Sequence, residues 1–223
     1  MPSISNIAAQ ALQRRILDGE FPAGAMLPSQ RDLSEQLSIS RSSLREALST
    51  LEALGLVRAQ PGKGVFVTGG NGPARAPKGT ASMTPRALLE FRLALEPAWT
   101  RLAALRLDAA GRQRLEAIQK GMDDALKACD LVMAADWDLQ FHLCLAELSG
   151  NPGFLAIAQQ FREQIGHSLR LPFSNAAGLW EPADEHHAIL AALRAGDADA
   201  AESAMRIHLR AAARRTHIDF SES

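Results

Sequence analysis

The chain has 223 residues, of which 47% are hydrophobic and 22% are charged, and its formal net charge is −1. This length allows one large domain or two ordinary domains with an adequate core, whereas the net charge favours no class of partner. No apolar stretch approaches the roughly 18 residues of a membrane-spanning helix, and the N-terminal segment lacks the apolar core of a signal peptide. Cys129 and Cys144 lie in apolar helical patterns and provide no disulfide framework. We therefore expect a cytoplasmic protein with no membrane partner.

Three helices are predicted at the start of the chain. Apolar residues with a period of 3.6 indicate a helix over residues 6–17, which a glycine and a proline then end. Ser29 can cap a short second helix, because an aspartate follows it three positions later. Ser40 can cap a third helix over residues 41–53, which a glycine stops.

A β-hairpin is predicted directly after the third helix. Two short runs rich in β-branched residues, 57–60 and 65–68, flank the turn sequence Pro-Gly-Lys-Gly. Three helices followed by such a hairpin are typical of a winged helix-turn-helix, which we assign to residues 1–68. Residues 69–83 are rich in Gly, Pro and Ala and are interpreted as a linker.

The rest of the chain is predicted to be helical. Residues 84–217 have helical apolar periodicity that turn residues interrupt. Breaks are expected near residues 108–111, 128–130, 149–153, 171–178 and 195–197. They predict a bundle of about six helices, followed by a tail at 218–223. The fold class is therefore mostly α, with a winged helix-turn-helix head joined to an all-α domain.

The third predicted helix has the features of a helix that reads DNA. Its first turn is polar and carries two arginines, whereas its opposite face is apolar. The candidate DNA-binding residues are Arg31 of the second helix, Arg41, Ser42, Ser43 and Arg45 of the third, and Gly62 and Lys63 of the hairpin tip. Arginine can pair bidentately with guanine, and lysine can bind phosphate. The alternative is that the arginines form a solvated surface with Asp32, Glu46 and Glu52.

Four polar side chains of the helical part have a spacing that lets them meet. Asp138 and His142 are four residues apart and share one face of a helix. His186 and His208 would be about 33 Å apart on one continuous helix. Gly and Asp at positions 196 and 197 favour a helix end followed by a new helix start, so the chain can fold back there. Residue 197 is midway between the two histidines, which would then lie opposite each other.

One carboxylate and three imidazoles suit a divalent transition metal. Asp138, His142, His186 and His208 are therefore predicted to bind one such ion per protomer, with zinc preferred and nickel, iron or manganese as alternatives. The simpler interpretation is that each is a half-buried helix residue without a ligand. The remaining histidines have no comparable spacing and are left out of the site: His167, His187 and His217.

Two pairs of long motifs are specific enough to compare with known families. They are LPSQRDLSEQLSISRSSLREALSTLEALGLV with QPGKGVFV in the head, and DLQFHLCLAELSGNP with EHHAILAALRAGDADAAESAMRIHL in the helical part. The first pair resembles the GntR family of bacterial transcription regulators, and the second resembles the FCD-type, metal-containing effector domain of its FadR-like branch. The resemblance implies a homodimer that binds a palindromic operator in double-stranded DNA and responds to a small organic acid. One departure is Gln30, where many relatives have glutamate.

The resemblance also implies roles for individual residues. In the family, the arginines that match Arg31, Arg41 and Arg45 and the glycine that matches Gly62 contact the operator. The metal ligands of metal-containing members match the same four residues that the helix geometry brings together.

Arg92 is the candidate effector-binding residue. In relatives that respond to sugar acids or hydroxy acids, the matching arginine meets the effector carboxylate. A guanidinium that faces an open metal position would hold one end of a carboxylate while the metal holds the other. The alternative is a structural pair of Arg92 with Glu96, four residues later.

Residues and resemblance together predict a regulator and not an enzyme. The leading hypothesis is a repressor that a small hydroxy-, keto- or sugar acid releases from DNA, with activation as the other outcome. A second hypothesis keeps the regulator but makes the metal purely structural, with an unrelated effector. A third makes the same four residues the centre of a metal-dependent hydrolase, with Glu147 or Glu185 as the base. The aromatic residues of the helical part are interpreted as core and left out of the site: Trp137, Phe173 and Trp180.

Overall fold

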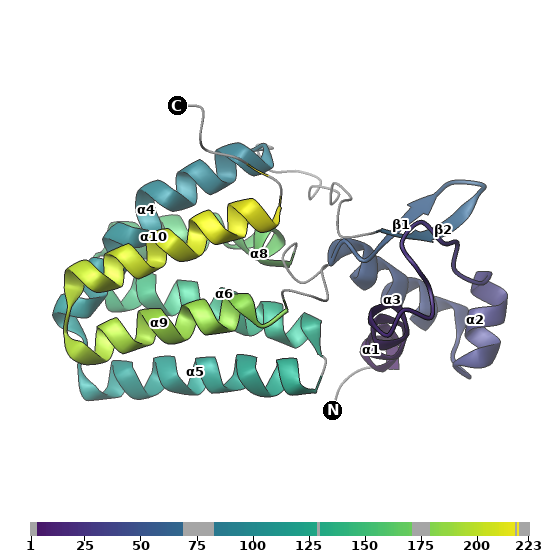
Figure 1. Ribbon diagram of the computed structural model, residues 1–223, viewed down its shortest axis with the longest axis horizontal. Coiled ribbons are helices and arrows are strands. Elements are labelled where there is room, and N and C mark those ends of the chain that lie inside the picture. The colour runs from purple at the N-terminus through teal and green to yellow at the C-terminus, as the bar shows by residue number, and fades with distance from the viewer. Residues whose placement is uncertain (1–3, 69–82, 129, 171–178, 217, 219–223) are drawn as a thin grey trace.

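The computed structural model describes residues 4–68, 83–128, 130–170, 179–216 and 218. The interpretations of the linker (69–82), Cys129, Phe173, His217 and the end of the tail fall outside these ranges. Figure 1 shows a smaller body of helices with a hairpin beside a larger body of helices. Within the described ranges, no helix is both long enough and apolar enough to cross a membrane.

The smaller body contains three helices at the predicted places, α1 (Ile4–Leu17), α2 (Gln30–Gln36) and α3 (Arg41–Ala53). The Oγ atoms of Ser29 and Ser40 each accept a hydrogen bond from the backbone N–H three residues later, at 3.2 and 3.1 Å. These bonds satisfy N–H groups that a helix start leaves without a partner. The two serines therefore set where α2 and α3 begin, as the sequence predicts.

Strands β1 (Val57–Gln60) and β2 (Gly64–Val67) pair antiparallel and form the hairpin. The second strand begins one residue earlier than predicted. Between the strands, a proline is followed by Gly62 with φ of 73°, and the Lys63 N–H donates to the Gln60 carbonyl at 3.0 Å. This is the pattern of a type II turn, which requires a positive φ at its third residue.

A leucine-rich core holds the smaller body together. Its fully buried leucines come from all three helices, from the segment before α2 and from the segment between α3 and β1: Leu12, Leu27, Leu33, Leu44, Leu51, Leu54 and Leu56. Burial of each such side chain contributes about 1.5–3 kcal/mol. The apolar face of α3 is thus fixed inward, and its polar first turn is left at the surface.

The larger body is entirely helical within the described residues. Its helices are α4 (Pro85–Arg106), α5 (Ala109–Lys127), α6 (Leu131–Leu148), α7 (Pro152–Gln160), α8 (Arg162–Arg170), α9 (Glu181–Ala195) and α10 (Ala198–Arg215). The sequence predicts about six helices, and the additional one arises from a break at Phe161 between α7 and α8. No glycine or proline lies at that break, so no turn signal marks it.

The reversal between α9 and α10 has the predicted chemistry. Gly196 ends α9 in the left-handed conformation with φ of 69°, and the Asp197 side chain accepts from the Ala200 N–H at 2.9 Å to begin α10. The two helices run antiparallel side by side (Figure 1). His186 and His208 consequently come from facing helices.

Helix α6 is the centre of the larger body. It packs against α4, α5, α7 and α8, and it is buried along most of its length. The buried interior nevertheless includes several polar or charged side chains: Arg92, Glu96, Gln119, Asp138, His142, His186 and His208. Because a buried charge is costly unless it is paired, this polar cluster indicates a site.

Candidate metal centre and DNA-binding surface

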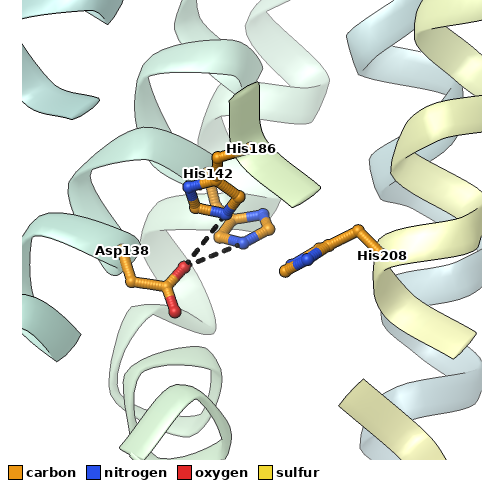
Figure 2. A group of neighbouring side chains, drawn as sticks. All are labelled: Asp138, His142, His186 and His208. Carbon is orange, nitrogen blue, oxygen red and sulfur yellow. Dashed lines mark ion pairs between the residues drawn. The ribbon is translucent and has the colours of Figure 1, made fainter. Parts of the chain in front are cut away.

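The four predicted metal ligands converge inside the larger body. Asp138 and His142 come from adjacent turns of α6, His186 from α9 and His208 from α10 (Figure 2). One candidate ligand atom from each lies within 4.8 Å of the other three. Each side chain is essentially buried, so the simpler interpretation of half-exposed helix residues does not describe them.

The spacing of the facing atoms fits coordination of one ion. Asp138 Oδ1 lies 3.2 Å from His142 Nε2 and 3.4 Å from His186 Nε2. A tetrahedral ion with bonds of about 2.0–2.1 Å holds its ligand atoms about 3.3 Å apart. Asp138 Oδ1, His186 Nε2 and His208 Nε2 are all buried and have no hydrogen-bond partner. Buried polar atoms almost always have a partner, and a divalent metal would satisfy all of them at once.

Outside this group, the other nitrogen of each imidazole faces an oxygen from a different helix. His186 Nδ1 lies 3.1 Å from Gln119 Oε1, and His208 Nδ1 lies 2.7 Å from Glu185 Oε2. His142 Nδ1 lies 2.5 Å from a Glu96 carboxylate oxygen, although the contact is not aligned as a hydrogen bond. Outer acceptors of this kind fix the orientation of metal-binding imidazoles and keep Nε2 unprotonated toward the metal.

The orientation of the Gln119 amide follows from its own contacts. Its Nε2 donates to Asp123 Oδ1 at 2.9 Å and lies 3.5 Å from the Ala183 carbonyl. Oε1 is therefore the atom that accepts from His186 Nδ1–H. Sequence reasoning missed Gln119 entirely, because only the packing of α5 against α9 reveals its position.

Arg92 is buried and takes part in this network. Its guanidinium binds Glu96, with Nε 2.5 Å from Oε1, and donates to Ser168 Oγ at 3.1 Å. The structural Arg92–Glu96 pair is therefore present. Nη2 also lies 3.4 Å from His142 Nε2, so the same guanidinium reaches the metal-facing side of the group.

Electrostatics favour the neutral form of two of the three imidazoles. Burial lowers the pKa of His208 and lowers that of His186 well below its usual value. Burial also lowers the pKa of His142, but the nearby carboxylates of Glu96 and Asp138 outweigh it and raise that pKa. Although burial raises the pKa of Glu96, the charges of Arg92 and His142 lower it to about 2. Glu96 is therefore a carboxylate at neutral pH.

Two other residues considered for the site, His187 and Glu147, have partners outside it. His187 is half-exposed and pairs with Asp123 at 3.2 Å, in agreement with its omission. Glu147 pairs with Arg114 at 2.6 Å on the surface, so it is not placed to act as a base. The side chain of His167 falls outside the described residues. Trp180 is 43% exposed and is not a core aromatic, contrary to prediction, because it lies just before the start of α9.

Most of the predicted DNA-binding residues of the head are exposed at its surface. Arg31, Arg41, Ser42 and Arg45 are exposed, and Gly62 and Lys63 are exposed at the tip of the hairpin. Ser43 is half-buried, and its backbone N–H is bound by the Ser40 cap. Arg31 pairs with Glu35 at 3.1 Å, not with Asp32, and at 74% exposure its side chain remains open to solvent.

The sequence matches two protein-family models. Residues 4–67 match the model of bacterial regulatory proteins of the gntR family, and residues 87–211 match the FCD domain. These two ranges span the head and most of the larger body.

Curated relatives extend the match over nearly the whole chain. An uncharacterized HTH-type transcriptional regulator of Mycobacterium tuberculosis is 31% identical, covering 93% of this chain and 87% of the relative. The Exu regulon transcriptional regulator of Escherichia coli is 29% identical over 90% of this chain and 80% of its own length. The HTH-type transcriptional repressor NanR of an Enterobacter species is 29% identical over 96% and 85%.

The fold is also similar to that of a solved GntR protein. A GntR protein of Streptococcus agalactiae superimposes with a TM-score of 0.53 at 28% identity, covering 95% of this chain and 99% of that chain. The relatives are regulators and not enzymes, so the hydrolase hypothesis is wrong. The chain belongs to the GntR family of bacterial transcriptional regulators, with a winged DNA-binding head followed by an FCD domain.

Proposed function

We propose that this protein is a cytoplasmic homodimer that represses transcription from a palindromic operator and senses a small organic acid at a metal centre. The observation that carries the proposal is the convergence of three buried imidazoles and one buried carboxylate, in which the facing atoms of Asp138, His186 and His208 have no hydrogen-bond partner. Repression is suggested by the relative named as a transcriptional repressor. A two-fold dimer would present two copies of α3 to two half-sites.

The metal would be held by Asp138, His142, His186 and His208. Zinc suits this donor set best, and nickel, iron or manganese are the alternatives. The ion would supply a Lewis-acidic position for a carboxylate or hydroxyl oxygen of the effector.

Arg92 would bind the other end of that effector. Its Nη2 already lies 3.4 Å from His142 Nε2, so an acid at the metal would meet a cation. Binding would then compete with Glu96 for the guanidinium, and the balance between these partners would move α4, the helix that follows the linker. The competing hypothesis is that the metal is purely structural. In that case Arg92 binds Glu96 and Ser168 and takes no part in effector binding.

DNA recognition is tested by a gel shift with the region upstream of the protein's own operon. Arg45→Ala should abolish the specific shift, because the loss of a bidentate guanine contact costs about 1–3 kcal/mol per half-site. Arg112→Ala, an exposed arginine of α5, is the matched control and should leave the shift unchanged. Equal weakening by both variants would contradict the assignment of α3.

Metal and effector are tested by thermal unfolding with a panel of small carboxylic acids. One acid should raise the melting temperature of metal-loaded protein and leave chelated protein unchanged. Arg92→Lys should remove most of that rise, because lysine cannot hold a carboxylate bidentately. If chelation lowers the melting temperature but no acid raises it in either form, the structural-metal hypothesis replaces this one.

A further inference from the structure

One carboxylate connects the metal group, which consists of the candidate ligands Asp138, His142, His186 and His208, to the end of α10. Glu185 lies on α9, one residue before the ligand His186, and its Oε2 lies 2.7 Å from Nδ1 of His208 on α10. The same carboxylate accepts two hydrogen bonds from Arg215, Nη1 to Oε1 at 2.7 Å and Nη2 to Oε2 at 2.9 Å. Its two oxygens thus bind both a candidate metal ligand and a cation.

The spacing of the two α10 residues explains this arrangement. His208 and Arg215 are seven residues apart, which is close to two helical turns, so both lie on the face of α10 that meets α9. His208 is 1% exposed and the Arg215 side chain 12%. A carboxylate held by two such donors has little rotational freedom.

The neighbouring Glu181 provides an internal comparison. It lies one turn earlier on α9 and also pairs with Arg215, at 3.1 Å, but its side chain is 57% exposed. No contact joins Glu181 to His208 among the described interactions. Both glutamates therefore connect α9 to α10, whereas Glu185 alone of the two connects to the metal group.

We propose that Glu185 is a positioning residue for the metal ligand His208, and that Arg215 holds Glu185 in place. By accepting the Nδ1 proton of His208, Glu185 would fix the ring orientation and leave Nε2 unprotonated toward the metal. Arg215 orients the carboxylate and offsets its charge. Metal affinity then depends on Arg215 in the last turn of α10, a residue that is not itself a candidate ligand. This inference rests on the proposed metal centre.

The test compares Glu185→Ala with Glu181→Ala in the full-length protein. Zinc affinity is measured by competition with a chromophoric chelator, and the tautomer of His208 is read from imidazole nitrogen chemical shifts. Glu185→Ala should weaken zinc binding about 10–100-fold and reduce the population of Nδ1–H tautomer. Glu181→Ala should leave both measurements as in the wild type, since it removes only an exposed ion pair.

Two further variants keep the test decisive if Glu185→Ala does not fold. Glu185→Gln retains an acceptor oxygen and should restore part of the affinity, and Arg215→Ala should give a loss smaller than that of Glu185→Ala. If Glu185→Ala and Glu181→Ala lower the melting temperature of chelated protein and leave zinc affinity unchanged, Glu185 only connects the helices and the proposal is wrong. If wild-type protein binds no metal, the proposed metal centre itself fails.

Discussion

At the scale of single residues, the position of the candidate metal ligand Asp138 depends on the close packing of α5 against α6. A Cβ added at Gly121 of α5 would lie 2.5 Å from Cε2 of Trp137, the residue directly before Asp138. The indole ring is rigid and cannot give way as a flexible side chain would. The absence of a side chain at Gly121 therefore lets α5 and α6 approach closely beside the candidate ligand Asp138.

Gly121→Ala should destabilise the protein by about 1–3 kcal/mol, although alanine is the better helix former. The free energy of unfolding is measured by urea denaturation of chelated protein. Gly121→Ala combined with Trp137→Leu should lose less stability than the sum of the single variants, because leucine leaves room for the methyl group. Additive losses would show that the two residues do not conflict.

The residues of the site differ in how far the sequence predicts them. Asp138 with His142 follows from helical periodicity, and His186 with His208 follows from a turn signal midway between them. The pairing of Glu96 with Arg92 follows from their separation of four residues, which is about one helical turn. Gln119 is 67 residues from His186, however, and no local pattern joins them. Such outer contacts depend on the rotation of each helix in the packed bundle, which periodicity does not specify.

At the scale of elements, the α9–α10 hairpin brings the candidate ligands His186 and His208 together, and Gly196 forms its turn. Its φ of 69° is strained for residues with a Cβ, although nothing lies within 4 Å of the Cβ position. The obstacle to substitution is therefore backbone conformation and not space. Asparagine tolerates this conformation better than other residues with a Cβ.

Gly196→Ala should destabilise chelated protein by about 1 kcal/mol, and Gly196→Asn should cost less. Differential scanning calorimetry of both variants provides the measurement. Zinc affinity should fall little in either, since the hairpin still closes. If alanine and asparagine cost the same, left-handed strain at Gly196 does not control this turn.

Boundaries of elements were predictable where a cap or a glycine marks them. Ser29 and Ser40 begin α2 and α3, and Asp197 begins α10, each through a side-chain bond to a backbone N–H. The break between α7 and α8 has no such residue. Phe161 simply ends one helix with φ of −100° and ψ of 14°, so packing of the surrounding helices decides this boundary.

At the scale of the whole molecule, the head lies against the turn between α5 and α6. The Gln10 amide of α1 donates to Asp130 Oδ2, and Arg14 Nη2 donates to the Ala128 carbonyl at 3.2 Å. One continuous buried cluster includes residues of both bodies, such as Leu12 of α1 and Leu131 of α6. Because α6 also supplies Asp138 and His142, the head contacts the start of the helix that bears two of the four candidate metal ligands.

An exchange of the Gln10–Asp130 pair tests whether this docking holds in solution. Asp130→Asn keeps the cap that accepts from the Met133 N–H, but it replaces the charged acceptor of the Gln10 bond by a neutral amide. Gln10→Glu brings two carboxylates together. Each single variant should weaken docking by about 1 kcal/mol, a roughly fivefold rise in amide exchange of α1. The double variant restores a donor and an acceptor with their positions exchanged, and its exchange rates should return toward those of the wild type. The docked arrangement would be contradicted if the amide exchange rates of α1 stay equally high in the double variant. It would also be contradicted if these rates do not rise in the single variants.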